Sequence, residues 1–142
     1  MPISKTRSPS KLEKSFYYGF RGIRYLVKQR NYRIALYITA IGIVFFMIFD
    51  RSFLPIFLGM SAVILVSEGT NSAIELLCNF VHEDHHPIIG EIKDMAAAGT
   101  VVAVFIASLI GLWEFVRLWG IVRGVIFWLL SILAMFLVFR NV

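Results

Sequence analysis

The chain has 142 residues, of which 58% are hydrophobic and only 16% are charged. Ordinary soluble domains carry about 25% charged residues, so this composition argues against that class and favours one small integral membrane domain. The formal net charge is +5, which a nucleic-acid-binding protein would also show, but apolar segments of membrane-spanning length make that class a poor match. The sequence therefore predicts an all-α membrane helical bundle, with residues 1–142 as a single domain.

The N-terminal region is basic and precedes the first long apolar segment. Residues 1–10 are typical of a flexible tail, and residues 11–28 are expected to form an amphipathic helix on the bilayer surface. Its apolar face repeats at helical spacing through Leu12, Phe16, Phe20, Ile23 and Val27. Nine of the fourteen Lys and Arg residues precede Ile34, so the positive-inside rule predicts a cytoplasmic N-terminus. We expect no secretory signal peptide.

Four apolar segments follow, at about 34–49, 54–80, 96–116 and 118–139. The first is short for a span of about 20 residues, so it must begin near Tyr32 or extend past Asp50. The polar stretch 82–94 is expected to be a cytoplasmic loop before the third segment. The fourth segment could cross the bilayer or lie along its surface, because Arg117 and Arg123 do not suit an external position.

The second apolar segment contains a polar stripe. Positions 68, 71, 72, 75 and 79 share one helical face, so Glu68, Asn71, Ser72, Glu75 and Asn79 are expected to form one row. Ionisable groups at membrane depth usually mark functional sites, although such a row could also bind neighbouring helices together. At 29 residues, segment 53–81 would be about 43 Å long, which places the stripe near the inner interface.

These residue types suit phosphoryl transfer. Carboxylate and amide oxygens can bind Mg²⁺, and a carboxylate without metal can accept a hydroxyl proton. Lys93 and Asp94 are expected at the start of the third segment, where exposed backbone N–H groups also favour anions. Phosphoryl transfer depends mainly on positioning and charge neutralisation, so these groups could supply it. The sequence contains no P-loop, protein-kinase loop or G-x-S-x-G motif.

Three histidines in the polar stretch allow other interpretations. His82, His85 and His86 could bind a transition metal with the nearby acids, or could simply form a solvated helix end. His86 alone could instead contact a nucleotide. Cys78 is expected to be a buried, inert thiol.

The segments EGTNSAIE (68–75) and HHPIIGEIKDMAAAGTVV (85–102) resemble the small integral-membrane diacylglycerol kinase family of bacteria. The resemblance covers about residues 11–116. It implies a homotrimer of three-span chains (here a core at 32–116) in the inner membrane, with cytoplasmic sites shared between subunits. Such enzymes use Mg²⁺ and transfer the γ-phosphate of ATP to a lipid hydroxyl. The segment 118–139 lies outside this pattern.

The resemblance also implies roles for individual residues. Glu68 would be the base beside the lipid hydroxyl, Glu75 would bind Mg²⁺, and Asn71 would orient nucleotide or metal. The nucleotide would be contacted by Lys93 and Asp94. The family's second metal-binding Glu falls here on Gln29, which keeps an oxygen ligand but lacks the charge.

The acceptor lipid is expected to be diacylglycerol, giving phosphatidic acid, with undecaprenol as the close alternative. Gln29 and the extra segment also allow a catalytically impaired member that acts in membrane assembly or lipid binding. A small metal transporter or channel is a third hypothesis, based on the intramembrane Glu residues and the His cluster.

Overall fold

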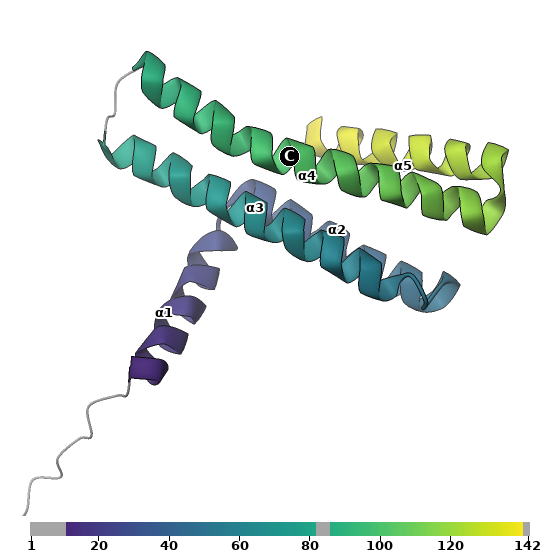
Figure 1. Cartoon of the computed structure of the whole chain (residues 1–142), viewed down its shortest axis with the longest axis horizontal. Helices are drawn as coiled ribbons and strands as arrows, with labels where there is room; N and C mark the ends of the chain where they lie inside the picture. Colours follow the sequence, from purple (N-terminus) through teal and green to yellow (C-terminus); the bar gives the residue numbers. More distant parts are fainter. Residues whose placement is uncertain (1–10, 82–85, 141–142) are drawn as a thin grey trace, which may run out of the picture.

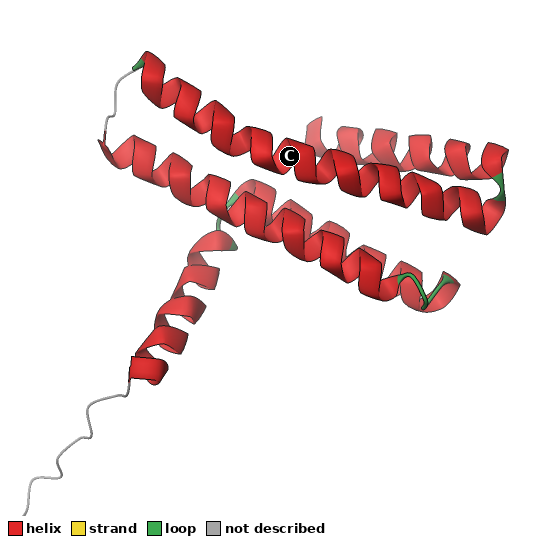
Figure 2. Cartoon of the chain, viewed as in Figure 1, coloured by secondary structure: helices red, strands yellow, loops and turns green. Residues whose placement is uncertain are grey.

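The computed structural model describes residues 11–81 and 86–140, which contain five α-helices and no strand. In chain order these are α1 (Lys11–Leu26), α2 (Arg30–Phe49), α3 (Leu54–Val81), α4 (Pro87–Trp119) and α5 (Ile121–Arg140). Helices α2 to α5 form an elongated bundle in which sequence neighbours pack together, while α1 points away from it (Figure 1). Short described segments separate α1 from α2, α2 from α3 and α4 from α5 (Figure 2), while residues 82–85 between α3 and α4 lie outside the described residues. The predicted all-α membrane bundle is confirmed.

Helix α1 is the predicted surface helix, although it ends at Leu26 rather than at residue 28. A turn closes it, in which the backbone N–H of Gln29 donates to the carbonyl oxygen of Leu26 at 2.9 Å. None of its residues is buried, so its apolar face has no partner within the described chain. That face is free to lie on a bilayer surface. The predicted tail, residues 1–10, lies outside the described residues.

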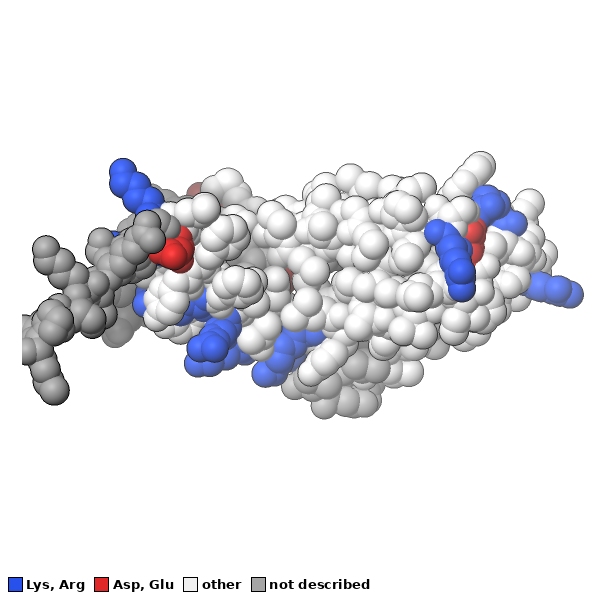
Figure 3. Space-filling model, turned by 90° about the horizontal axis from the view of Figure 1, so that it is seen from below, with Lys and Arg blue, Asp and Glu red and all other residues white. Residues whose placement is uncertain are grey.

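Helices α2, α3 and α4 are each long and apolar enough to cross a membrane. Helix α2 has 20 residues and begins at Arg30, so the short first segment gains its length at its N-terminal end. On the face seen in Figure 3, Lys and Arg lie at the two ends of the molecule and a middle zone lacks them. This distribution is typical of a membrane-spanning bundle. The chain is a multi-pass membrane protein.

Helix α4 corrects one expectation from the sequence, because it begins at Pro87 and not near residue 95. His86 has extended backbone angles before it, and Pro87 occupies the first turn, where a missing N–H costs nothing. Residues 87–94, expected as part of a loop, are therefore helical. Lys93 and Asp94 lie in the second turn of α4, where backbone N–H groups are already bonded within the helix. The expectation that exposed backbone N–H groups beside Lys93 would help to bind an anion was therefore wrong.

Helix α5 turns back along α4 after Gly120, whose φ of 77° suits a glycine at this reversal. Leu118 and Trp119, expected in the fourth segment, belong to α4. The indole Nε1 of Trp128 donates a hydrogen bond to the carbonyl oxygen of Ser108 at 3.0 Å, which joins the two helices. Helix α5 thus packs along a candidate span (Figure 1), but it is not itself among the three candidate spans of the described residues.

The close approach of α5 to α4 depends on Gly124. A Cβ atom built on Gly124 would lie 2.6 Å from both the Cα and the N of Val116, so any side chain forces the backbones apart. We expect Gly124→Ala to lower the free energy of unfolding by about 1–3 kcal/mol, as overpacking does. Thermal unfolding in detergent micelles would measure the change. Gly111→Ala is the control, because its added methyl meets no atom within 4 Å. Equal melting temperatures for the two variants would contradict this account.

A charged cluster closes the end of the bundle at the α2–α3 turn. Arg117 of α4 donates from Nε to Glu114 Oε2 at 2.9 Å and from a terminal nitrogen to Glu114 Oε1 at 2.6 Å. Arg117 also forms an ion pair with Asp50 in the turn. Glu114 is only 2% exposed. These contacts explain how Arg117 can lie at the end where the sequence made a positive charge unexpected.

Aromatic side chains from three helices surround the same end of the bundle. Phe45 of α2 has ring contacts with Phe115 and Trp119 of α4 and with Phe127 of α5. The rings of Phe115 and Trp119 are stacked, with centroids 5.5 Å apart. These contacts hold α5 against α2 and α4. The extra helix is therefore packed into the bundle.

Candidate functional site

The polar stripe of α3 is divided between a buried part and an exposed part. Glu68, Asn71 and Ser72 are 6%, 5% and 5% exposed, whereas Glu75 and Asn79 are exposed. The buried part points into the bundle because α3 packs against both α2 and α4. No hydrogen bond or ion pair to the Glu68 carboxyl is found in residues 11–81 and 86–140. Glu68 is thus a buried carboxyl group without a protein partner in the described chain.

Asn71 and Glu75 form a direct pair, as their spacing of four residues allows. The Asn71 side-chain amide donates from Nδ2 to Glu75 Oε1 at 3.0 Å. The other amide atom, Asn71 Oδ1, is buried and lacks a hydrogen-bond partner among the described residues. A buried oxygen without a partner costs about 1–3 kcal/mol, so Asn71 Oδ1 would gain from binding a cation or a hydrogen-bond donor. An amide oxygen and a carboxylate oxygen from residues one helical turn apart are a donor set that suits a hard cation such as Mg²⁺.

Lys93 of α4 reaches the exposed end of the stripe. Its Nζ donates to Asn79 Oδ1 at 2.7 Å, which places a cation one helical turn beyond Glu75. Asp94, the next residue, is exposed.

The histidines of the polar stretch are only partly described. His86 precedes α4, whereas His82 and His85 lie outside the described residues. Within the described residues, no group of three or more His, Cys, Asp and Glu residues could hold a metal ion together.

Gln29 is the residue that precedes α2, and it is half-buried. Its backbone is extended, and its side chain does not cap the helix. In the described part of the chain no hydrogen bond joins Gln29 to Glu75.

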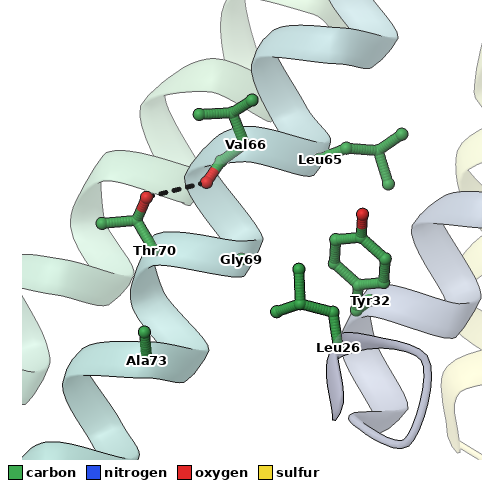
Figure 4. A pocket seen from close by; sticks show the side chains of 7 residues that line it. All are labelled: Leu26, Tyr32, Leu65, Val66, Gly69, Thr70 and Ala73. Carbon is green, nitrogen blue, oxygen red and sulfur yellow. Dashed lines mark hydrogen bonds between the residues drawn. The ribbon is translucent and has the colours of Figure 1, made fainter. Parts of the chain in front are cut away.

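A shallow hollow of about 400 Å³ lies beside the stripe, where α1, α2 and α3 meet. Figure 4 shows Leu26 and Tyr32 facing Gly69, the residue that follows Glu68 on the adjacent face of α3. The remaining lining residues are Leu65, Val66, Thr70 and Ala73. The Thr70 hydroxyl donates to the carbonyl oxygen of Val66 at 2.9 Å, so the hollow presents mostly apolar surface. Such a surface suits an acyl or prenyl chain rather than a nucleotide.

Two residues to which the sequence assigned no individual role, although Asn79 was placed on the stripe, have defined partners. Asn79 holds Lys93, and Glu114 is held by Arg117. The spacing of three residues between Glu114 and Arg117 was a signal in the sequence that could have indicated their pairing. The Asn79–Lys93 contact had no such signal, because it depends on how α3 and α4 are aligned.

The polar stripe, the nearby cation and the apolar helices can be compared with known families. A family model described as prokaryotic diacylglycerol kinase matches residues 17–115. Helix α5 lies outside this match. No curated protein matches the chain. No solved structure matches it either. Because the match covers more than half of the 142 residues, the chain belongs to the prokaryotic diacylglycerol kinase family.

Proposed function

We propose that this protein is an ATP-dependent lipid kinase that transfers the γ-phosphate to the hydroxyl of diacylglycerol, giving phosphatidic acid. Membership of a lipid kinase family supports the general reaction class. The observation that supports it in this chain is the Asn71–Glu75 pair, with an unsatisfied amide oxygen, on the same stripe as the buried Glu68. One helix thus carries a possible metal site and a separate carboxyl group.

The residues present fit Mg²⁺. Glu75 would supply a carboxylate oxygen and Asn71 its unpartnered Oδ1, and Gln29 would add an amide oxygen in place of the family's second Glu. When bound, Mg²⁺ would neutralise charge on the phosphate oxygens. No hydrogen bond joins Gln29 to Glu75 within the described residues of one chain. We therefore propose that the complete site is formed between subunits of a homotrimer.

Different side chains would then have different roles in the reaction. Glu68 accepts the proton of the lipid hydroxyl as that oxygen attacks the γ-phosphorus, and the bond to the β-phosphate oxygen of ATP breaks. Lys93 places positive charge beside the phosphate chain, and Asp94 and His86 contact the nucleotide. Because Glu68 is 6% exposed, this role requires the lipid hydroxyl to enter the bundle interior. We place this end of the bundle on the cytoplasmic side of the inner membrane, where ATP is available.

Undecaprenol is the alternative acceptor, since the hollow beside Gly69 would accept a prenyl chain as well as an acyl chain. Transfer of radiolabelled phosphate from ATP in mixed micelles containing either lipid tests both acceptors. We expect labelled phosphatidic acid with diacylglycerol and weaker labelling of undecaprenol. Labelling of undecaprenol alone would reassign the substrate. Labelling of neither lipid by folded protein with Mg²⁺ present would reject the kinase proposal.

A catalytically impaired family member is a second candidate, because Gln29 replaces a charged ligand. We expect Gln29→Glu to restore that charge and to lower the Mg²⁺ concentration needed for half-maximal activity by about tenfold, the effect of roughly 1.4 kcal/mol. A magnesium titration of phosphate transfer measures this shift. Gln29→Leu should have the opposite effect. If Gln29→Glu left the magnesium dependence unchanged, position 29 would not be a metal ligand.

A further inference from the structure

Lys93 is held in place by an amide that none of the proposed roles uses. Its ammonium donates to Asn79 Oδ1 at 2.7 Å, across from α4 to the last turn of α3. Within residues 11–81 and 86–140, Lys93 forms no ion pair, although Asp94, Glu91 and Glu75 are all nearby in the sequence or on the facing helix. Among the described residues, a neutral oxygen therefore holds a cation that forms no ion pair with a carboxylate.

The position of Asn79 connects this contact with the Asn71–Glu75 pair. Asn71, Glu75 and Asn79 follow one another at intervals of four residues, so they lie on one face of α3. Asn79 lies about 6 Å along the helix axis beyond Glu75. The hydrogen bond from Lys93 thus brings a positive charge to the turn next to the proposed metal ligand. A triphosphate bound at Glu75 would extend over a distance of this order.

We propose that Asn79 is a positioning residue, which holds the Lys93 ammonium ready for the phosphate chain of a nucleoside triphosphate. This inference rests on the proposed kinase function. A lysine side chain has many rotamers, and fixing them before binding reduces the entropy lost when the ligand arrives. A neutral acceptor achieves this without forming an ion pair that the phosphates would have to displace. Asn79 therefore contributes to nucleotide affinity without touching the reacting atoms.

The test is the replacement of Asn79 by Leu, which removes the acceptor, and by Asp, which keeps an oxygen in the same place. We expect Asn79→Leu to raise the KM for ATP about threefold to tenfold, the effect of losing one hydrogen bond, with kcat within about twofold of the unmodified protein. Asn79→Asp keeps an oxygen but pairs the ammonium with a carboxylate that the phosphates would have to displace, so the KM for ATP should rise in this variant as well. Asn31→Leu is the matched control, because Asn31 is exposed on α2 and no hydrogen bond to its side chain is found in the described residues.

A second measurement separates this inference from the kinase proposal. Binding of a non-hydrolysable ATP analogue, measured by calorimetry with Mg²⁺ in detergent, does not require phosphate transfer. Asn79→Leu should weaken this binding about threefold to tenfold. If the two residues act together, the double variant Asn79→Leu with Lys93→Gln should bind the analogue only slightly more weakly than Lys93→Gln alone. Analogue affinity and KM unchanged in Asn79→Leu would overturn the positioning role, even if its melting temperature fell. Lack of transfer by the unmodified protein, with weaker analogue binding in Asn79→Leu, would reject the kinase proposal alone.

Discussion

Glu68→Gln should reduce kcat for phosphate transfer by about 10²–10⁴-fold, the contribution typical of a positioned general base. The amide of Gln has nearly the same shape as the carboxyl group of Glu but cannot accept the hydroxyl proton. The KM for ATP should change little, because the groups proposed to contact the nucleotide belong to α4 and to the residue before it. Initial rates at saturating lipid and ATP, with detergent-solubilised protein, measure the effect.

The stability of the same variant distinguishes a base from a structural residue. Glu68 is buried, and no partner for its carboxyl group is found among the described residues. Replacing such a group by a neutral isostere should leave the free energy of unfolding unchanged or increase it. Glu91→Gln is the control, since Glu91 is exposed on α4 and should tolerate the same change without loss of activity. A variant that kept its kcat would remove Glu68 from the mechanism, and a large loss of stability would indicate a structural role.

The stripe on α3 could be predicted from the sequence because a helical period fixes which residues share a face. The alternating direction of the spans and the existence of α5 could also be predicted, since they follow from segment length and charge. The start of α4 could not. Residues 87–94 are too polar to be recognised as part of a membrane helix, yet Pro87 begins one there. This shift moves Lys93 into the second turn of α4, where it reaches Asn79.

The division of the stripe into buried and exposed parts also could not be predicted from the sequence. Periodicity places Glu68 and Glu75 on one face, but it does not show how far the neighbouring helices extend over that face. In the structure Glu68 is buried and Glu75 is exposed at the end of the bundle. This difference is consistent with the separate roles proposed for them. Glu68 would accept a proton in the bundle interior, and Glu75 would bind a metal ion near solvent. Asp50 and Glu114 were similarly unpredictable as neighbours, because they are distant in the chain.

Arg117→Leu should lower the free energy of unfolding by about 3 kcal/mol, the lower end of the range for breaking a buried ion pair. The lower end applies because the Arg117 side chain is 49% exposed, so solvent already screens part of the interaction. Glu114 is 2% exposed and the Asp50 side chain 13% exposed, so their carboxylates would be left close together without a counter-charge. Unfolding in detergent by heat or by added denaturant would measure the loss.

Two further variants show whether charge compensation, rather than packing, causes this loss. Arg123→Leu is the matched control, since Arg123 is exposed near the start of α5 and forms no ion pair within the described residues. Its replacement should change the free energy of unfolding by less than about 0.5 kcal/mol. Arg117→Leu combined with Glu114→Leu removes both charges of the Arg117–Glu114 pair and should recover much of the stability lost in Arg117→Leu alone. A double variant less stable than Arg117→Leu would mean that the pair matters through its shape and packing. Recovery would establish that Arg117 compensates a carboxylate which the fold has placed almost out of contact with solvent.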